Sequence, residues 1–155
     1  MPVLALTDLP AALPPGTPVA GLDLGTKTIG VAVSDRSLTV ASPLSVISRV
    51  KFTADLEALL RLMSGRGAVG MIIGLPVNMD GSEGPRCQSA RAFARHVLLR
   101  ADRPIAFWDE RLSTAAVNRV LITEADSSRA RRAQVVDSLA ATWILQGALD
   151  RLRMV

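Results

Sequence analysis

The stretch Val19 to Val33 constrains the fold of this chain most strongly, because it predicts a β-hairpin with a charge inside one strand. It reads VAGLDLGTKTIGVAV, two runs of strand-forming residues around a short polar turn. Strand alternation puts Asp23 on the same face as Gly21 and Gly25. Burying a carboxylate without a partner is costly, so Asp23 is either an ordinary solvated residue or held for a purpose. The glycines leave room for a ligand, which makes Asp23 a candidate site residue.

Composition limits the kinds of protein that this chain can be. Its 155 residues suit one domain, and 49% hydrophobic with 21% charged residues is typical of a folded protein. No apolar run approaches the roughly 18 residues of a membrane span, so we expect no membrane partner. One cysteine excludes an intramolecular disulfide and a multi-cysteine zinc site, and it fits a cytoplasmic location. The net charge of +4 is a weak indication of nucleic-acid binding.

The first 18 residues differ in character from the rest of the chain. They are mildly apolar, contain Asp8 and several prolines, and lack the basic region of a signal peptide. We therefore expect residues 1–18 to be a poorly ordered leader and residues 19–155 to form a single domain.

The pattern beyond the hairpin predicts a mixed α/β domain. Pro43 in the third predicted strand indicates an edge position or a bulge. Thr53 and Ser113 are expected to cap helices, and Pro85 to begin one. The expected elements are strands over 38–47, 68–74 and 104–108, and helices over 53–64, 85–100, 113–122 and 132–152. Three strands in a meander, followed by alternating helices and strands, predict an antiparallel portion joined to a parallel one.

Three acidic residues lie where an ordinary surface carboxylate is not expected. Asp23 is on the first strand, Glu110 follows the last strand, and Asp137 is in an apolar helical stretch. Open α/β sheets bind ligands at the carboxyl ends of their strands. Separate acids in apolar settings suggest a site for a hard cation such as Mg²⁺. Three unrelated ion pairs with nearby arginines, for example Glu110 with Arg111, are the alternative.

Five segments, in this order, carry a family resemblance: GLDLGTKTIGVAVSD (21–35), IIGLPVNMDGSEGP (72–85), FARHV (93–97), WDERLST (108–114) and VDSLAATWILQ (136–146). Together they resemble the YqgF family of the RNase H-like superfamily, the pre-16S rRNA nucleases also described as Holliday-junction-resolvase-like. The resemblance implies an α/β fold with a mixed five-stranded sheet, its first three strands antiparallel, flanked by helices. Five collinear segments are far more specific than any single motif.

The resemblance also implies a function. Asp23, Glu110 and Asp137 match the metal-binding catalytic triad of the superfamily, which implies that the three acids converge. The implied activity is hydrolysis of nucleic-acid phosphodiesters with Mg²⁺ or Mn²⁺. Within this family, the implied role is processing of the 16S rRNA precursor in ribosome biogenesis.

Several polar residues at or beside the family motifs are candidates for contacts with nucleic acid: Lys27, Asn78, Arg86, Arg111, Arg131 and Arg132. Each also has a structural interpretation. Asn78 could only shape its turn, Arg111 could only hold Glu110, and the arginines near residue 130 could belong to a solvated basic loop. The expected partner is structured RNA, with branched DNA as an alternative, and the protein itself is expected to be a monomer or homodimer.

Three other functions stay open at this stage. One is a Holliday-junction-type DNA resolvase, and another is a non-catalytic nucleic-acid-binding module on the same scaffold. The third follows from the DLGT turn, which also resembles the phosphate-binding turn of sugar kinases and actin-like ATPases. Those enzymes need two lobes, and the length of this chain supplies one domain, so a phosphotransferase is disfavoured.

Overall fold

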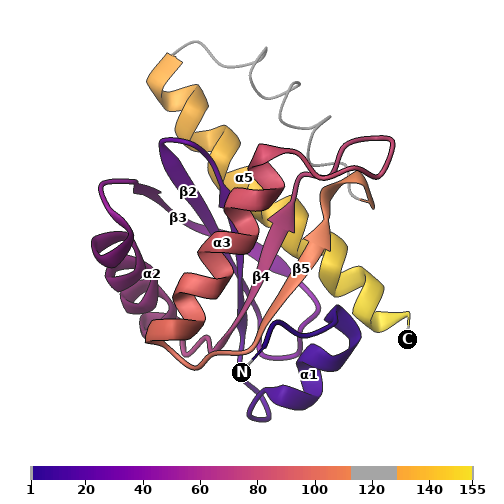
Figure 1. Cartoon of the computed structure of the whole chain (residues 1–155). Coiled ribbons are helices and arrows are strands. Elements are labelled where there is room, and N and C mark those ends of the chain that lie inside the picture. Colours follow the sequence, from indigo (N-terminus) through magenta and orange to yellow (C-terminus); the bar gives the residue numbers. More distant parts are fainter. Residues whose placement is uncertain (1, 113–128, 155) are drawn as a thin grey trace.

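The computed structural model describes residues 2–112 and 129–154, and for residues 129–138 it describes only the backbone. Its centre is one five-stranded sheet in the order β3-β2-β1-β4-β5. Helices α2 and α3 pack on one face of this sheet, and the long helix α5 crosses the other face (Figure 1). The predicted α/β fold, a mixed five-stranded sheet flanked by helices, is therefore confirmed.

The sheet combines an antiparallel half with a parallel half, as the strand pattern predicts. β1 (Val19–Leu24), β2 (Thr28–Ser34) and β3 (Ala41–Ser48) form an antiparallel meander. β4 (Gly70–Leu75) pairs in parallel with β1, and β5 (Ile105–Asp109) pairs in parallel with β4. β3 is an edge strand and its register with β2 shifts at Pro43, so both expectations for this proline hold.

Two helices cover the first face of the sheet. α2 (Phe52–Arg66) ends at Gly67, whose φ of +71° is the left-handed conformation that favours glycine. α3 (Pro85–Arg100) begins at its proline, as predicted. The prediction that Thr53 caps α2 is wrong, because the helix begins one residue earlier, at Phe52. The Phe52 ring packs edge-on against Phe93 with centroids 5.5 Å apart, which brings this residue into the helix.

The other face is covered by α5 (Arg129–Arg153), which lies unusually close to the sheet. A Cβ added at Gly21 would lie 2.6 Å from Leu145 Cβ and 3.2 Å from the Ala141 carbonyl oxygen. Only a glycine on β1 permits this approach. The apolar core on this face includes Ile72 and Trp108 from the sheet and Ile144 and Leu145 from the helix.

The N-terminal residues differ from the poorly ordered leader that the sequence predicts. η1 (Leu6–Asp8) and α1 (Leu9–Ala12) pack beside the sheet, and Leu9 is fully buried. The Leu4 backbone N–H donates a hydrogen bond to the Ile105 carbonyl oxygen at 2.8 Å, along the outer edge of β5. The exposed edge of β5 supplies a hydrogen-bond partner for this segment, and the open end of the core accepts its apolar side chains. Composition alone could not show either contact.

The helix expected to begin at Ser113 lies outside the described residues. Of the helices that the structure describes, none combines the length and the hydropathy needed to cross a membrane.

Candidate active site

Asp23 is held in the middle of the sheet and is almost fully buried. It lies near the carboxyl end of β1, is only 4% exposed, and is paired with Gly30 on β2. The parallel register with β4 continues from Leu22 opposite Ile73, so Gly74 lies on the other side of Asp23. Because Gly21 faces α5, strand alternation directs Asp23 to the α5 face as well. A rigid strand therefore fixes a carboxylate between two glycines.

Glu110 lies above the neighbouring strand. It is the first residue of η2 (Glu110–Leu112), directly after β5 ends. A Cβ added at Gly74 would lie 2.6 Å from Ile144 Cδ1 and 3.4 Å from the Glu110 carboxyl carbon, so Ile144 of α5 covers Gly74 and the carboxyl group lies beside it. Asp23 and Glu110 thus occupy adjacent positions at the carboxyl end of the sheet.

Asp137 belongs to α5, one helical turn before Ala141. Figure 1 shows the N-terminal part of α5 extending past the edge of the sheet at which β4 and β5 end. Residue 137 belongs to this N-terminal part of the helix. Its side chain lies outside the described residues, so its place in the triad stays a prediction. Among the side chains that are described, there is no group of three His, Cys, Asp or Glu able to hold a metal ion.

Arg111 fixes the end of β5. Its Nη2 lies 2.7 Å from Asp109 Oδ2, and its Nε donates to the same carboxylate at 3.1 Å. The hydrogen bonds from Arg111 hold the pKa of Asp109 below its usual range and raise the pKa of the guanidinium in turn. The sequence left open an ion pair between Arg111 and Glu110. In the structure Arg111 instead forms a bidentate pair with Asp109. A contact of Arg111 with nucleic acid stays a prediction.

Asn78 shapes the loop between β4 and α3. Its Nδ2 donates to Ser82 Oγ at 3.0 Å, and its backbone N–H donates to the Ser82 carbonyl oxygen at 2.9 Å. Asp80 accepts the Ser82 hydroxyl and backbone N–H, and these bonds lower the pKa of the Asp80 carboxyl. These contacts support the structural interpretation of Asn78, whose side chain is nevertheless exposed.

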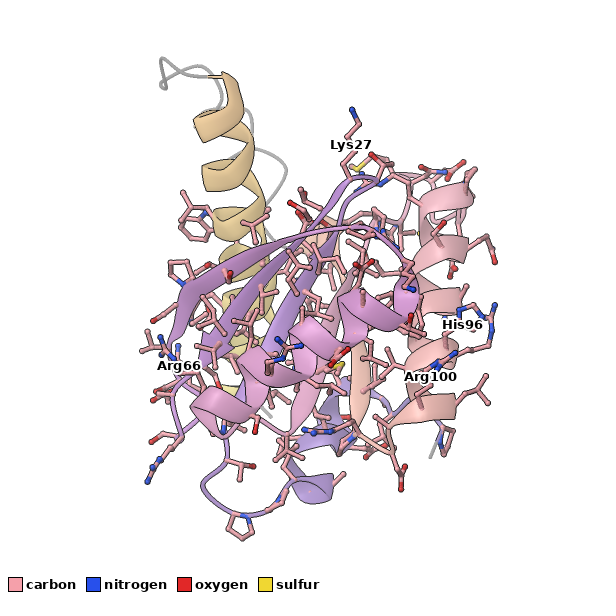
Figure 2. All side chains as sticks on the ribbon, turned by 90° about the vertical axis from the view of Figure 1, so that its left-hand side faces the viewer. Lys27, Arg66, His96 and Arg100 are labelled. Carbon is pink, nitrogen blue, oxygen red and sulfur yellow. The ribbon has the colours of Figure 1, made fainter. Side chains whose placement is uncertain are left out.

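Of the other cationic residues predicted to contact nucleic acid, two lie at the same end of the sheet as Asp23. The side chains of the remaining two are not described. Lys27 is exposed in the β1–β2 turn and points away from the sheet (Figure 2). Arg86, in the first turn of α3, donates from Nη2 to the Leu24 carbonyl oxygen at 3.3 Å. Arg131 and Arg132 lie near the start of α5, in the part for which only the backbone is described.

Sequence reasoning missed Arg49 and Lys51, which join β3 to α2. Arg49 Nη1 donates to the Gly25 carbonyl oxygen at 2.6 Å, which brings it beside the turn that follows Asp23. One signal was available in the sequence. Both residues follow a predicted strand at the sheet edge where the candidate acids gather.

Comparison with known proteins identifies the family. Residues 17–151 match the family model RuvX, described as Holliday junction resolvase. The chain belongs to the RuvX family. A relative from Phenylobacterium zucineum is 68% identical over 99% of this chain and 99% of its own length. One from Rhodospirillum rubrum is 62% identical over 98% of this chain and 94% of its own length. Both are named "Putative pre-16S rRNA nuclease", so the predicted resemblance to the YqgF family, another name for RuvX, is confirmed.

Solved structures support the fold of this RuvX-family protein. RuvC from Thermus thermophilus in complex with a Holliday junction substrate superposes with a TM-score of 0.54 at 12% identity, covering 90% of this chain and 98% of RuvC. A second RuvC structure gives 0.50 at 14% identity, covering 89% and 96%. At such identities the likeness concerns the fold alone. It confirms the predicted RNase H-like arrangement.

Proposed function

We propose that this RuvX-family protein is a divalent-ion-dependent nuclease that processes the precursor of 16S rRNA. One observation carries the chemistry: two carboxylates, from Asp23 and Glu110, adjoin Gly74 at the carboxyl end of the sheet. The names of its close relatives support the RNA substrate. A cytoplasmic location, and a monomer or homodimer, are part of the same proposal.

The residues of the site fit a hard cation. Carboxylate oxygens are the ligands that Mg²⁺ and Mn²⁺ accept, and Mg²⁺ usually relies on one or two carboxylates plus substrate phosphate. Asp23, Glu110 and Asp137 would hold such an ion. When bound, the ion supplies Lewis acidity that activates water and stabilises the leaving oxygen of a phosphodiester.

The protein itself supplies position. Asp23 is on a central strand and 4% exposed, so its carboxylate loses little freedom when the substrate binds. Asp109 holds Arg111 beside Glu110 through the bidentate pair, which fixes the chain where β5 ends. Lys27 and Arg86 place positive charge around the same edge, where it attracts the phosphates of the substrate.

Cleavage of four-way DNA junctions is a second candidate function. The family is described as Holliday junction resolvase, and a RuvC with this fold has been solved with such a junction. The same pair of acids would serve either substrate, because both reactions hydrolyse a phosphodiester.

A cleavage panel tests the proposal. Purified protein is incubated with 16S precursor RNA, unrelated single-stranded RNA and four-way DNA junctions, each with Mg²⁺, Mn²⁺ or EDTA. We expect cleavage of the precursor only with a divalent ion. Asp23→Asn and Glu110→Gln should each reduce the rate at least about 100-fold, which is the order of effect of losing one stabilising group of a reaction centre.

The matched control is Glu57→Gln, because Glu57 is an exposed acid on α2 whose one salt bridge within the described side chains is with Arg61 in the next helical turn. It should cleave at the wild-type rate. Circular dichroism establishes that all three variants are folded. Undiminished cleavage by folded Asp23→Asn would disprove the assigned site, and selective cleavage of junctions would favour the resolvase.

A further inference from the structure

A cavity of about 580 Å³ opens beside the β1–β2 turn, on the face of the sheet opposite α5. Its walls are the end of β1, the 49–51 segment and the first turns of α2 and α3. Leu24 lines it, and Leu24 directly follows Asp23 on the strand. Since successive strand residues face opposite sides, the cavity and the candidate active site lie on the two sides of one strand end.

The cavity is lined by three cationic side chains, Arg49, Lys51 and Arg86. In the part of the chain that the structure describes, none of these three forms a salt bridge with a carboxylate. Arg49 and Arg86 each donate one bond to a carbonyl oxygen at the end of β1, at 2.6 Å and 3.3 Å. A guanidinium carries five N–H donors, so most of them remain available to an anion.

One acid, Asp55, also lines the cavity, and it has a structural task. It is 4% exposed, and its Oδ1 accepts the backbone N–H of Val50 at 3.0 Å. This bond holds the 49–51 segment against the start of α2, and thereby positions the two cationic residues on either side of Val50. With one acid against three cations, the lining keeps an excess of positive charge.

The ends of α2 and α3 add to this potential. Both helices begin at the cavity, and neither has a side chain that caps its first turn. Helix N-termini carry partial positive charge, so they reinforce the attraction that the three cationic side chains exert on an anion.

We propose that this cavity binds a phosphate of the nucleic-acid substrate that flanks the phosphate to be cleaved. The inference rests on the proposed nuclease function and names residues that this function does not require for chemistry. A strand that crosses the β1–β2 turn presents one phosphate to Asp23 and Glu110 and a neighbouring phosphate to Arg49, Lys51 and Arg86. Bidentate pairing with guanidinium groups is the usual way in which proteins bind phosphate.

The test measures binding of a fluorescein-labelled RNA from the 16S precursor by anisotropy over a range of salt concentrations, together with cleavage kinetics. Lys51→Gln is the first variant, because the Lys51 side chain makes no hydrogen bond or salt bridge in the described structure. Arg49→Gln is the second. Each should weaken binding about tenfold and make the salt slope shallower by about 0.7 per lost phosphate contact on a single strand.

The matched control is Arg66→Gln. Arg66 is an exposed arginine at the opposite end of α2, far from the turn that carries Lys27 (Figure 2). It should keep wild-type affinity and salt slope, because it lies outside the cavity. In a parallel experiment the protein is titrated with inorganic phosphate and with ADP, and binding is measured as the shift in its melting temperature. This distinguishes a nucleic-acid subsite from a site for small anions.

Each result decides the inference. The subsite is disproved if both Lys51→Gln and Arg49→Gln bind RNA with wild-type affinity and salt slope and still cleave it. The proposed nuclease function would be unaffected by that result. Loss of ADP or phosphate binding alone, with RNA binding unchanged, also disproves the subsite. Failure of the wild-type protein to bind or cleave any nucleic acid overturns both proposals.

Discussion

At the scale of single residues, the glycines near Asp23 make room for α5. The sequence suggested that Gly21 leaves room for a ligand, but that expectation is wrong. The space at Gly21 is filled by Leu145, so this glycine exists for helix packing. The space at Gly74 is filled mainly by Ile144, also from α5, and the Glu110 carboxyl group lies beside it. Both glycines thus let α5 approach the sheet, and Gly74 also borders the two acids.

Gly21→Ala should destabilise the protein by roughly 1–3 kcal/mol, the usual cost of overpacking a core. The added methyl group would lie 2.6 Å from Leu145 Cβ and 3.2 Å from a backbone oxygen of α5, and neither atom moves by a side-chain rotation. Urea denaturation measures the change. We also expect slower cleavage, because a displaced α5 moves Asp137.

Gly65→Ala is the matched control. Gly65 lies within α2, and an added Cβ would meet no heavy atom within 4 Å beyond its chain neighbours and the backbone of its own helix. Alanine should therefore raise the free energy of unfolding by roughly 0.5–1 kcal/mol through helix propensity alone. If Gly21→Ala were as stable as wild type, the close approach of α5 would be contradicted.

At the scale of elements, the connection between β2 and β3 is held by one carboxylate. Asp35 Oδ1 accepts the backbone N–H groups of Thr39 at 2.7 Å and Val40 at 3.0 Å, and Oδ2 accepts the Thr39 hydroxyl at 2.7 Å. These bonds lower the pKa of Asp35 from 3.8 to about 2, and the hydrogen bond from the Thr39 side chain has the largest effect. The same turn contains Leu38 at a φ of 57°, a conformation that leucine rarely adopts.

This turn should make stability depend on pH in the acid range. A lowered pKa means that the charged form stabilises the fold, fully above the unfolded value of 3.8 and less as the pH falls toward about 2. Asp35→Asn keeps an acceptor for both N–H groups but does not titrate. The difference in unfolding free energy between wild type and Asp35→Asn should thus be constant above about pH 5 and shrink below pH 4.

Urea denaturation between pH 3 and pH 7 measures this difference, and an NMR titration of the Asp35 carboxyl group gives its midpoint directly. The effect should be small, because the residue is exposed and its charge is screened by solvent. A midpoint near 4 for Asp35 would show that the hydrogen bonds to Thr39 and Val40 do not hold in solution.

At the scale of the whole molecule, the N-terminal residues complete the α5 side of the core. Leu9 is fully buried among residues of the sheet and α5, and Leu4 pairs with the outer edge of β5. Leu9→Ala should therefore lower the free energy of unfolding by about 2–4 kcal/mol, as for other buried leucines.

Leu99→Ala provides the comparison, since Leu99 on α3 is 82% exposed and its truncation should change stability by less than about 0.5 kcal/mol. Equal stability of the two variants would mean that residues 2–13 are loosely attached, as the sequence alone suggested. Urea denaturation of both variants at one pH decides between these possibilities.

How far the sequence predicts this molecule depends on the range of the interaction involved. The hairpin around Asp23, the edge position of β3 and the start of α3 at Pro85 all follow from local pattern or from rigid proline geometry. The capping of α2 did not follow, because packing of Phe52 on Phe93 moved the start of the helix. The position of Arg49 also depends on a contact between distant segments, because its hydrogen-bond partner, Gly25, is 24 residues away.

The sequence by itself determined the family, the order of the elements and the identity of the candidate acids, because these depend on spacing along the chain. Only the tertiary structure decided that Gly21 and Gly74 make room for α5, that Glu110 lies beside Gly74, and that three cations gather around one cavity. Those facts depend on which residues of different elements meet, and contacts between distant segments are fixed by packing of the whole chain.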